Sequence, residues 1–152
     1  MVERYLCKVD VRSSILLGST QIRARRPGLG YLRCMEVIGS RKRNQPAPPR
    51  FIFDDLCDPY RQPARPWLHL LDDETPPTVI ESNRPHRVVW SSLWAKRPDA
   101  RVQFDLDAAG GGTDLRWTLY VDEPLPDAIL ARHMRKRMNE LINANLRFTY
   151  GQ

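Results

Sequence analysis

The chain has 152 residues, of which 41% are hydrophobic and 28% are charged, and its formal net charge is +6 at pH 7. This length predicts one domain that is large enough to bury a real core. The positive charge is compatible with nucleic acid, anionic lipid or an acidic partner. However, arginine outnumbers lysine 20 to 4 and the basic residues are spread along the chain. The charge alone therefore favours none of these partners, and nucleic acid is not expected.

The cysteines and the hydropathy pattern exclude several classes of protein. Cys7, Cys34 and Cys57 are widely spaced and form no CxxC pair. This excludes a zinc ribbon or a thioredoxin-type motif and predicts free thiols in a reducing compartment. No apolar run approaches the ~20 residues that a membrane span needs. The N-terminus also lacks the apolar segment of a secretory signal, so we expect a cytoplasmic protein.

The first part of the chain carries the weakest pattern. Residues 1–30 are interpreted as an N-terminal extension, with loose alternation that is compatible with extra strands. A strand is predicted at 32–38. Residues 39–49 are basic and rich in proline, which predicts a connector. The Arg41-Lys42-Arg43 cluster inside it is typical of a solvated loop, with a phosphate contact as the less favoured alternative.

Two short helices are predicted next. The first opens at Pro48-Pro49, because proline fits the first helical turn, and it ends at Asp58-Pro59. The second short helix, or a turn, has its apolar body at 67–71. The acidic residues 72–74 that follow are interpreted as caps or a solvated face, and not as a general acid–base pair.

From residue 78 the pattern changes to a period of two, which predicts strands. The expected strands are 78–82, 87–94, 101–107 and 115–121. In each of the last two, alternate apolar residues form one inward face. The three glycines at 110–112 permit the positive φ that a tight hairpin needs.

One amphipathic helix is predicted from Asp127, a plausible N-cap, to about Phe148. Leu130, Met134, Met138 and Leu141 form its apolar stripe. A short sheet that is followed by a single long helix predicts that the helix lies across the sheet. The fold class is therefore α+β, an antiparallel sheet wrapped around a long C-terminal helix, with two short helices after the N-terminal strand.

Four short motifs occur in an order that resembles the START/SRPBCC superfamily, the helix-grip fold of the polyketide cyclase/dehydratase-like proteins. They are APPRFIFDDLCDP (47–59), RPWL (65–68), RVVWSSLW (87–94) and GGTDLRWTL (111–119), which leads into the final helix. The resemblance assigns residues 31–152 to a helix-grip domain. Family members usually have more strands before the long helix than the four predicted here.

The resemblance implies that a hydrophobic or amphipathic small molecule binds in a cavity between the sheet and the C-terminal helix. Burial of apolar surface would drive binding, and a few polar groups would orient the ligand. The expected apolar lining consists of Trp67, Val88, Trp90, Trp94, Phe104, Trp117, Leu119, Met134, Met138 and Leu141. The expected polar groups are Ser92, Arg116, His133 and Asn145.

Among the polar groups, His133 lies at the edge of the helix stripe and is the candidate acid or base. Asn145 lies one turn after Leu141, where a buried amide needs partners. Arg137 borders the same stripe and either extends to solvent or reaches a ligand carboxylate. The three histidines lie on different elements without paired spacing, so no metal site and no cofactor are expected.

Three alternatives remain open at this level. The same pocket suits a polyketide aromatase/cyclase- or dehydratase-like enzyme, although no catalytic residue is identified. A binder of nucleic acid or an acidic partner would use Arg41, Lys42 and Arg43. A protein-interaction module would have a filled core and no cavity. A monomer and a homodimer are both compatible with the sequence.

Overall fold

The computed structural model describes residues 35–61 and 66–151. Two units are distinguished, Met1–Glu36 and Val37–Gln152, and the elements below belong to the second, apart from the first residue of β1. The expected extension at 1–30 lies outside the described residues, so it stays a prediction.

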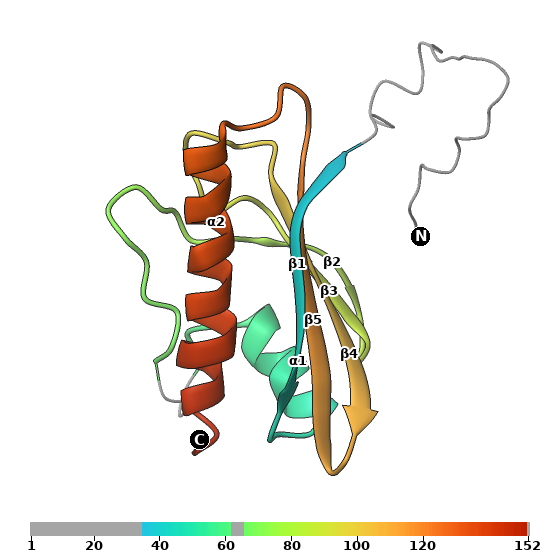
Figure 1. The fold of residues 1–152 in the computed structure, drawn as a ribbon. Coiled ribbons are helices and arrows are strands. Elements are labelled where there is room, and N and C mark those ends of the chain that lie inside the picture. The colour runs from blue at the N-terminus through green and yellow to red at the C-terminus, as the bar shows by residue number, and fades with distance from the viewer. Residues whose placement is uncertain (1–34, 62–65, 152) are drawn as a thin grey trace, which may run out of the picture. The chain divides into compact units, whose positions relative to one another are not determined.

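One antiparallel sheet forms the body of this unit. Its five strands lie in the order β1-β5-β4-β3-β2, as Figure 1 shows. The strands are β1 (Glu36–Gln45), β2 (Val79–Asn83), β3 (Arg87–Trp90), β4 (Arg101–Ala109) and β5 (Gly112–Val121). The register places Phe104 of β4 opposite both Val88 of β3 and Trp117 of β5. An apolar row therefore crosses the sheet.

Side-chain alternation explains why one face of the sheet is buried. Along β4 the buried residues are Val102, Phe104 and Leu106, and the residues between them are half-buried. Gly110 and Gly111, which join β4 to β5, have φ of 57° and 81°, values that favour glycine. The predicted strands and their hairpin are confirmed here.

The long C-terminal helix lies along the buried face of the sheet (Figure 1). It comprises α2 (Ala128–Glu140) and continues as the π-helical segment η3 (Leu141–Leu146). At its start the Asp127 carboxylate accepts a hydrogen bond of 2.8 Å from the N–H of Leu130, as an N-cap does. The predicted α+β helix-grip architecture is confirmed.

A short helix, α1 (Pro49–Cys57), packs under the same face and buries Ile52, Phe53 and Leu56. It is tied to the sheet by Trp90, whose indole N–H donates to the carbonyl of Leu56 at 2.8 Å. Trp67 stacks on Trp90 with ring centroids 6.1 Å apart. Aromatic rings thus fill the space between α1 and the strands.

The connector predicted at 39–49 is wrong, because β1 extends to Gln45. β1 is an edge strand, and most of its residues are polar and exposed. It therefore shows no apolar alternation, although that alternation is the signal that identifies a strand in a sequence. The basic cluster 41–43 lies in this strand and not in a loop.

The second short helix predicted at 67–71 does not form. Its backbone groups bond instead to side chains and turns: the Glu74 carboxylate accepts from the N–H of Leu71 at 2.9 Å, and Arg137 donates to the carbonyl of His69 at 2.8 Å. The strand predicted at 87–94 also ends early, at Trp90. Beyond it Trp94 forms an isolated bridge with Glu74.

The close approach of β1 and β5 gives a stability prediction. A Cβ on Gly112 would lie 2.1 Å from the carbonyl oxygen of Gln45, and backbone cannot yield easily. We expect Gly112→Ala to lower the free energy of unfolding by about 1–3 kcal/mol, measured by urea denaturation. Gly111→Asn is the control, because asparagine tolerates positive φ and nothing lies within 4 Å. Equal stability of the two variants would contradict this packing argument.

Candidate functional site

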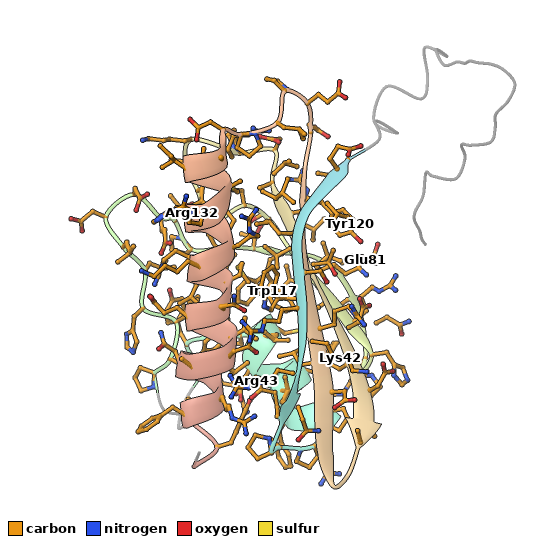
Figure 2. The ribbon with its side chains drawn as sticks, in the orientation of Figure 1. Lys42, Arg43, Glu81, Trp117, Tyr120 and Arg132 are labelled. Carbon is orange, nitrogen blue, oxygen red and sulfur yellow. The ribbon has the colours of Figure 1, made fainter. Side chains whose placement is uncertain are left out.

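The structure brings the expected apolar lining together between α2 and the sheet. All ten of those residues belong to one core cluster and are at most 2% exposed. Trp117, for example, points from the middle of β5 toward the helix (Figure 2). The helix–sheet interior, as we call the space these residues share, is therefore closed to solvent in this structure.

The four expected polar groups are not gathered there. Ser92 closes a local turn, in which its hydroxyl accepts from the N–H of Trp94 at 2.9 Å and donates to its carbonyl at 3.1 Å. Arg116 is exposed, on the opposite face of β5 from Trp117, because alternate strand residues face opposite ways. Asn145 is only half-buried.

The buried amide of the helix is Asn143, which is 8% exposed. The reason is the π-helical segment, whose i→i+5 hydrogen bonds advance the inward position by five residues. Leu146 therefore follows Leu141 on the buried face, where a regular α-helix would place Asn145. The sequence offers no signal for this change in register.

Several buried polar atoms have no hydrogen-bond partner among the described residues. Three are indole nitrogens of the interior lining, those of Trp67, Trp94 and Trp117, two are the amide oxygens of Gln45 and Asn143, and one is Nε2 of His133. Leaving such a group unpaired in a core costs about 1–3 kcal/mol. Most buried polar side-chain atoms in proteins do have partners, so this set requires an explanation. Gln45 was missed at the sequence level because it lies in the expected connector.

A buried ion pair joins the segment after α1 to the long helix. The Glu74 carboxylate accepts from Nε of Arg137 at 2.7 Å and from Nη2 at 2.8 Å. Neither side chain is more than 6% exposed. Arg137 also donates to Glu140. Arg137, for which extension to solvent and contact with a ligand carboxylate were both left open, is therefore paired with a carboxylate of the protein itself, and Glu74 is not on a solvated face.

The electrostatics of this pair follow from its burial and its partners. Desolvation, the largest influence, raises the pKa of Glu74. The hydrogen bonds from Arg137 and Leu71 and the positive charge of Arg137 outweigh it, so the pKa lies below the usual value of 4.5. The hydrogen bond with Glu74 raises the pKa of Arg137. Both groups are thus charged at neutral pH.

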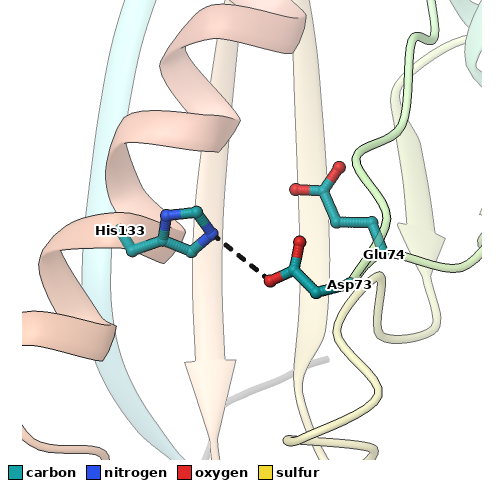
Figure 3. Close-up of side chains that lie close together, drawn as sticks. All are labelled: Asp73, Glu74 and His133. Carbon is teal, nitrogen blue, oxygen red and sulfur yellow. Dashed lines mark ion pairs between the residues drawn. The ribbon is translucent and has the colours of Figure 1, made fainter.

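His133 lies beside this pair, facing the turn that carries Asp73 (Figure 3). Its Nε2 is 3.7 Å from the Asp73 carboxylate, which is longer than a hydrogen bond. Ligand atoms of Asp73, Glu74 and His133 lie within 4.8 Å of one another. However, both Glu74 oxygens accept from Arg137. A metal ion would have to compete with that guanidinium, so the cluster is an ion-pair network.

A second buried carboxylate, Asp55, ties the end of the chain to α1. It accepts from the Tyr150 hydroxyl at 2.6 Å and from Nε of Arg61 at 2.7 Å. Burial, and then the bond to Asp55, raise the pKa of Tyr150. Asp55 is therefore a structural group with both oxygens occupied.

Comparison with solved structures identifies the fold. The crystal structure of CalU16 from Micromonospora echinospora superposes with a TM-score of 0.53 at 16% identity, over 73% of this chain and 80% of that one. An AHSA1-like protein from Rhizobium etli superposes with a TM-score of 0.54 at 21% identity, over 78% of this chain and 84% of that one. A protein from Rhodobacter sphaeroides superposes with a TM-score of 0.50 at 22% identity, over 76% of this chain and 97% of that one.

The chain thus has a helix-grip fold, and the resemblance predicted from the motifs is confirmed at the level of the fold. No family model matches the sequence, and no protein of curated function matches it. None of the helices in the described residues is long and apolar enough to cross a membrane.

The buried ion pair gives a mutational prediction. Arg137→Met leaves the Glu74 carboxylate buried and unpaired, so we expect it to lower the free energy of unfolding by about 3–5 kcal/mol. The double variant Glu74→Leu/Arg137→Met should recover most of that loss. Arg132→Met, at an exposed position on the same helix, should stay within about 0.5 kcal/mol of the wild type. An Arg137→Met variant as stable as this control would contradict the role of the pair.

The lowered pKa of Glu74 gives a pH dependence. A carboxylate with a depressed folded-state pKa stabilises the protein above its unfolded-state pKa, and this contribution disappears as the pH falls through the folded-state value. Between about pH 7 and pH 3 the wild type should therefore lose more unfolding free energy than Glu74→Leu/Arg137→Met. Urea denaturation across this range measures both, and parallel pH profiles would refute the assignment.

Proposed function

We infer that this protein binds a small amphipathic molecule, with an apolar body and at least one acceptor oxygen, in the helix–sheet interior. The observation that carries this proposal is the set of three buried indole N–H groups, on Trp67, Trp94 and Trp117, without a partner among the described residues. Unpaired donors are unfavourable in a packed apolar core, because each one lowers the free energy of unfolding. A carbonyl or hydroxyl oxygen of a ligand would accept from one or more of them.

Entry of a ligand requires the closed interior to open, and residues 66–77 are the segment best suited to move. They contain no helix and join the sheet only through the isolated bridge of Glu74 with Trp94. Side chains hold them in place, chiefly Arg137. Two of the unpaired indoles, Trp67 and Trp94, lie in this segment or against it. On the helix side, Met134 and Met138 supply flexible side chains that can repack around a guest.

The two rivals differ in what they leave unexplained. A protein-interaction module with a filled core accounts for the closed interior but not for the unpaired donors. A cyclase- or dehydratase-like enzyme needs an acid or base in the interior, whereas His133 lies 3.7 Å from Asp73, and its buried Nε2 has no hydrogen-bond partner among the described residues. Ligand binding without catalysis accounts for the unpaired donors and requires no acid or base in the interior.

A matched pair of probes tests the proposal. The compounds 2-acetylnaphthalene and 2-ethylnaphthalene have nearly the same shape, but only the first has an acceptor oxygen. We expect it to bind about tenfold more tightly, which is about 1.4 kcal/mol and within the range of one buried hydrogen bond. In nitrogen–proton NMR spectra it should shift an indole signal of Trp67, Trp94 or Trp117. The signal of Trp90, whose N–H is bonded to Leu56, is the internal control.

Trp117→Phe removes one donor and keeps an aromatic ring. If Trp117 is the donor, this variant should lose the preference for the ketone while it still binds 2-ethylnaphthalene. The matching changes at Trp67 and Trp94 test the other two donors. If neither compound binds and all four indole signals stay in place, the filled-core module is the better description.

A further inference from the structure

The long helix and the edge strand β1 run side by side (Figure 1). At one end Nη1 of Arg135 donates to the carbonyl of Ile38 at 3.0 Å. At the other end Arg147 donates to the carbonyl of Asn44. The line between these two contacts is called the β1–α2 seam below, and it borders the helix–sheet interior described above.

The register of β1 decides which of its side chains face the seam. Gly39 faces the helix, because a Cβ there would lie 2.6 Å from Cγ of Arg135. Gln45 also faces it, and its amide donates to the carbonyl of Ile142 at 3.3 Å. Since side chains alternate along a strand, Arg41 and Arg43 lie on this side too. Lys42 lies on the other side, 3.3 Å from Asp114, and Figure 2 shows Lys42 and Arg43 apart in this way.

The seam gathers positive charge that no acid in its own two segments, residues 37–45 and 128–147, balances. Arg41 and Arg43 are exposed and form no ion pair with a described residue. Arg135 and Arg147 bond to carbonyls, which leaves their charge uncompensated. Residues 37–45 contain no acid, and the only acid in 128–147 is Glu140, which pairs with Arg137. Arg132 and Lys136, within one turn of Arg135, are exposed and extend the basic surface.

The distances between these arginines are too large for one small anion to contact all of them, so the row suits a ligand with more than one anionic group. Arg135 and Arg147 are 12 residues apart in the sequence, which is roughly 18 Å along a helix. Arg41 and Arg43 are two residues apart on a strand, which is about 6.6 Å along the strand axis. Each guanidinium offers a planar fork of donors that binds phosphate in a bidentate manner. A single small anion would satisfy only part of this row.

We propose that the β1–α2 seam is a binding site for a ligand that carries at least two phosphate groups, in the form of a free polyphosphate compound or a phospholipid surface. Nucleic acid is less favoured, because residues 37–45 and 128–147 contain no Phe, Tyr or Trp on which bases would stack, although the exposed Phe148 follows directly after Arg147. The site does not depend on the ligand proposed for the interior, since it uses different residues on the outside of the helix.

The decisive experiment compares two double variants of the full chain. Arg41→Gln/Arg43→Gln and Lys42→Gln/Arg116→Gln each remove two positive charges from exposed positions, but only the first pair lies in the seam. Calorimetric titration with sodium tripolyphosphate should show binding that weakens between about 50 and 300 mM NaCl. The seam variant should bind at least about tenfold more weakly, and the control variant within about twofold of the wild type. Thermal unfolding verifies that both remain folded.

Co-sedimentation with phosphatidylglycerol vesicles, against phosphatidylcholine vesicles as the reference, separates the two phosphate sources. Selective loss in the seam variant with either probe supports the site and identifies the source. Equal loss in both double variants, or no binding to either probe, would overturn it. A short oligothymidylate that outcompetes tripolyphosphate would also overturn it, in favour of nucleic acid.

Discussion

The guanidinium of Arg137 is the interaction on which the arrangement around the helix depends. It is buried, and it binds Glu74, Glu140 and the carbonyl of His69 at once. Residues 66–77 are held by Arg137 together with the stacking of buried Trp67 on Trp90 and the hydrogen bond from the N–H of Thr75 to the carbonyl of Leu93. Arg137 thus joins the long helix to the segment that carries Trp67.

The interior itself combines two features that a simple core would not combine. Its apolar side chains are shut from solvent as completely as any packed core. Yet three indole donors of its lining are unpaired among the described residues. The first feature describes the interior as the structure has it, and the second is the observation on which the proposed ligand rests. The proposed opening through residues 66–77 would connect the two.

The sequence predicted the elements whose own residues carry the pattern. β4, β5 and the long helix each bury one regular face, so period and punctuation were sufficient. β1 was partly missed because it is an edge strand that contacts arginine side chains of the long helix, and such a strand needs few apolar residues. The Glu74–Arg137 pair, between residues 63 positions apart, has no local signature, and in sequence Glu74 resembles a solvated acid. Asn143 is buried in place of Asn145 because the helix contains a π-helical segment. A prediction from the 3.6-residue period of an α-helix does not include such a segment.

The two sides of the long helix differ in how the charges of their arginines are balanced. On the side of residues 66–77, the protein supplies carboxylates, and Arg137 is neutralised within the structure. On the side of β1, Arg135 and Arg147 meet only carbonyl groups, and Arg41 and Arg43 add to the same field. Arg135 and Arg147 occupy the carbonyls of Ile38 and Asn44, which protects this part of the open edge of β1 from pairing with other strands, but the carbonyls do not cancel the positive charge. The helix therefore closes the sheet edge with side chains that keep their charge available to an outside anion.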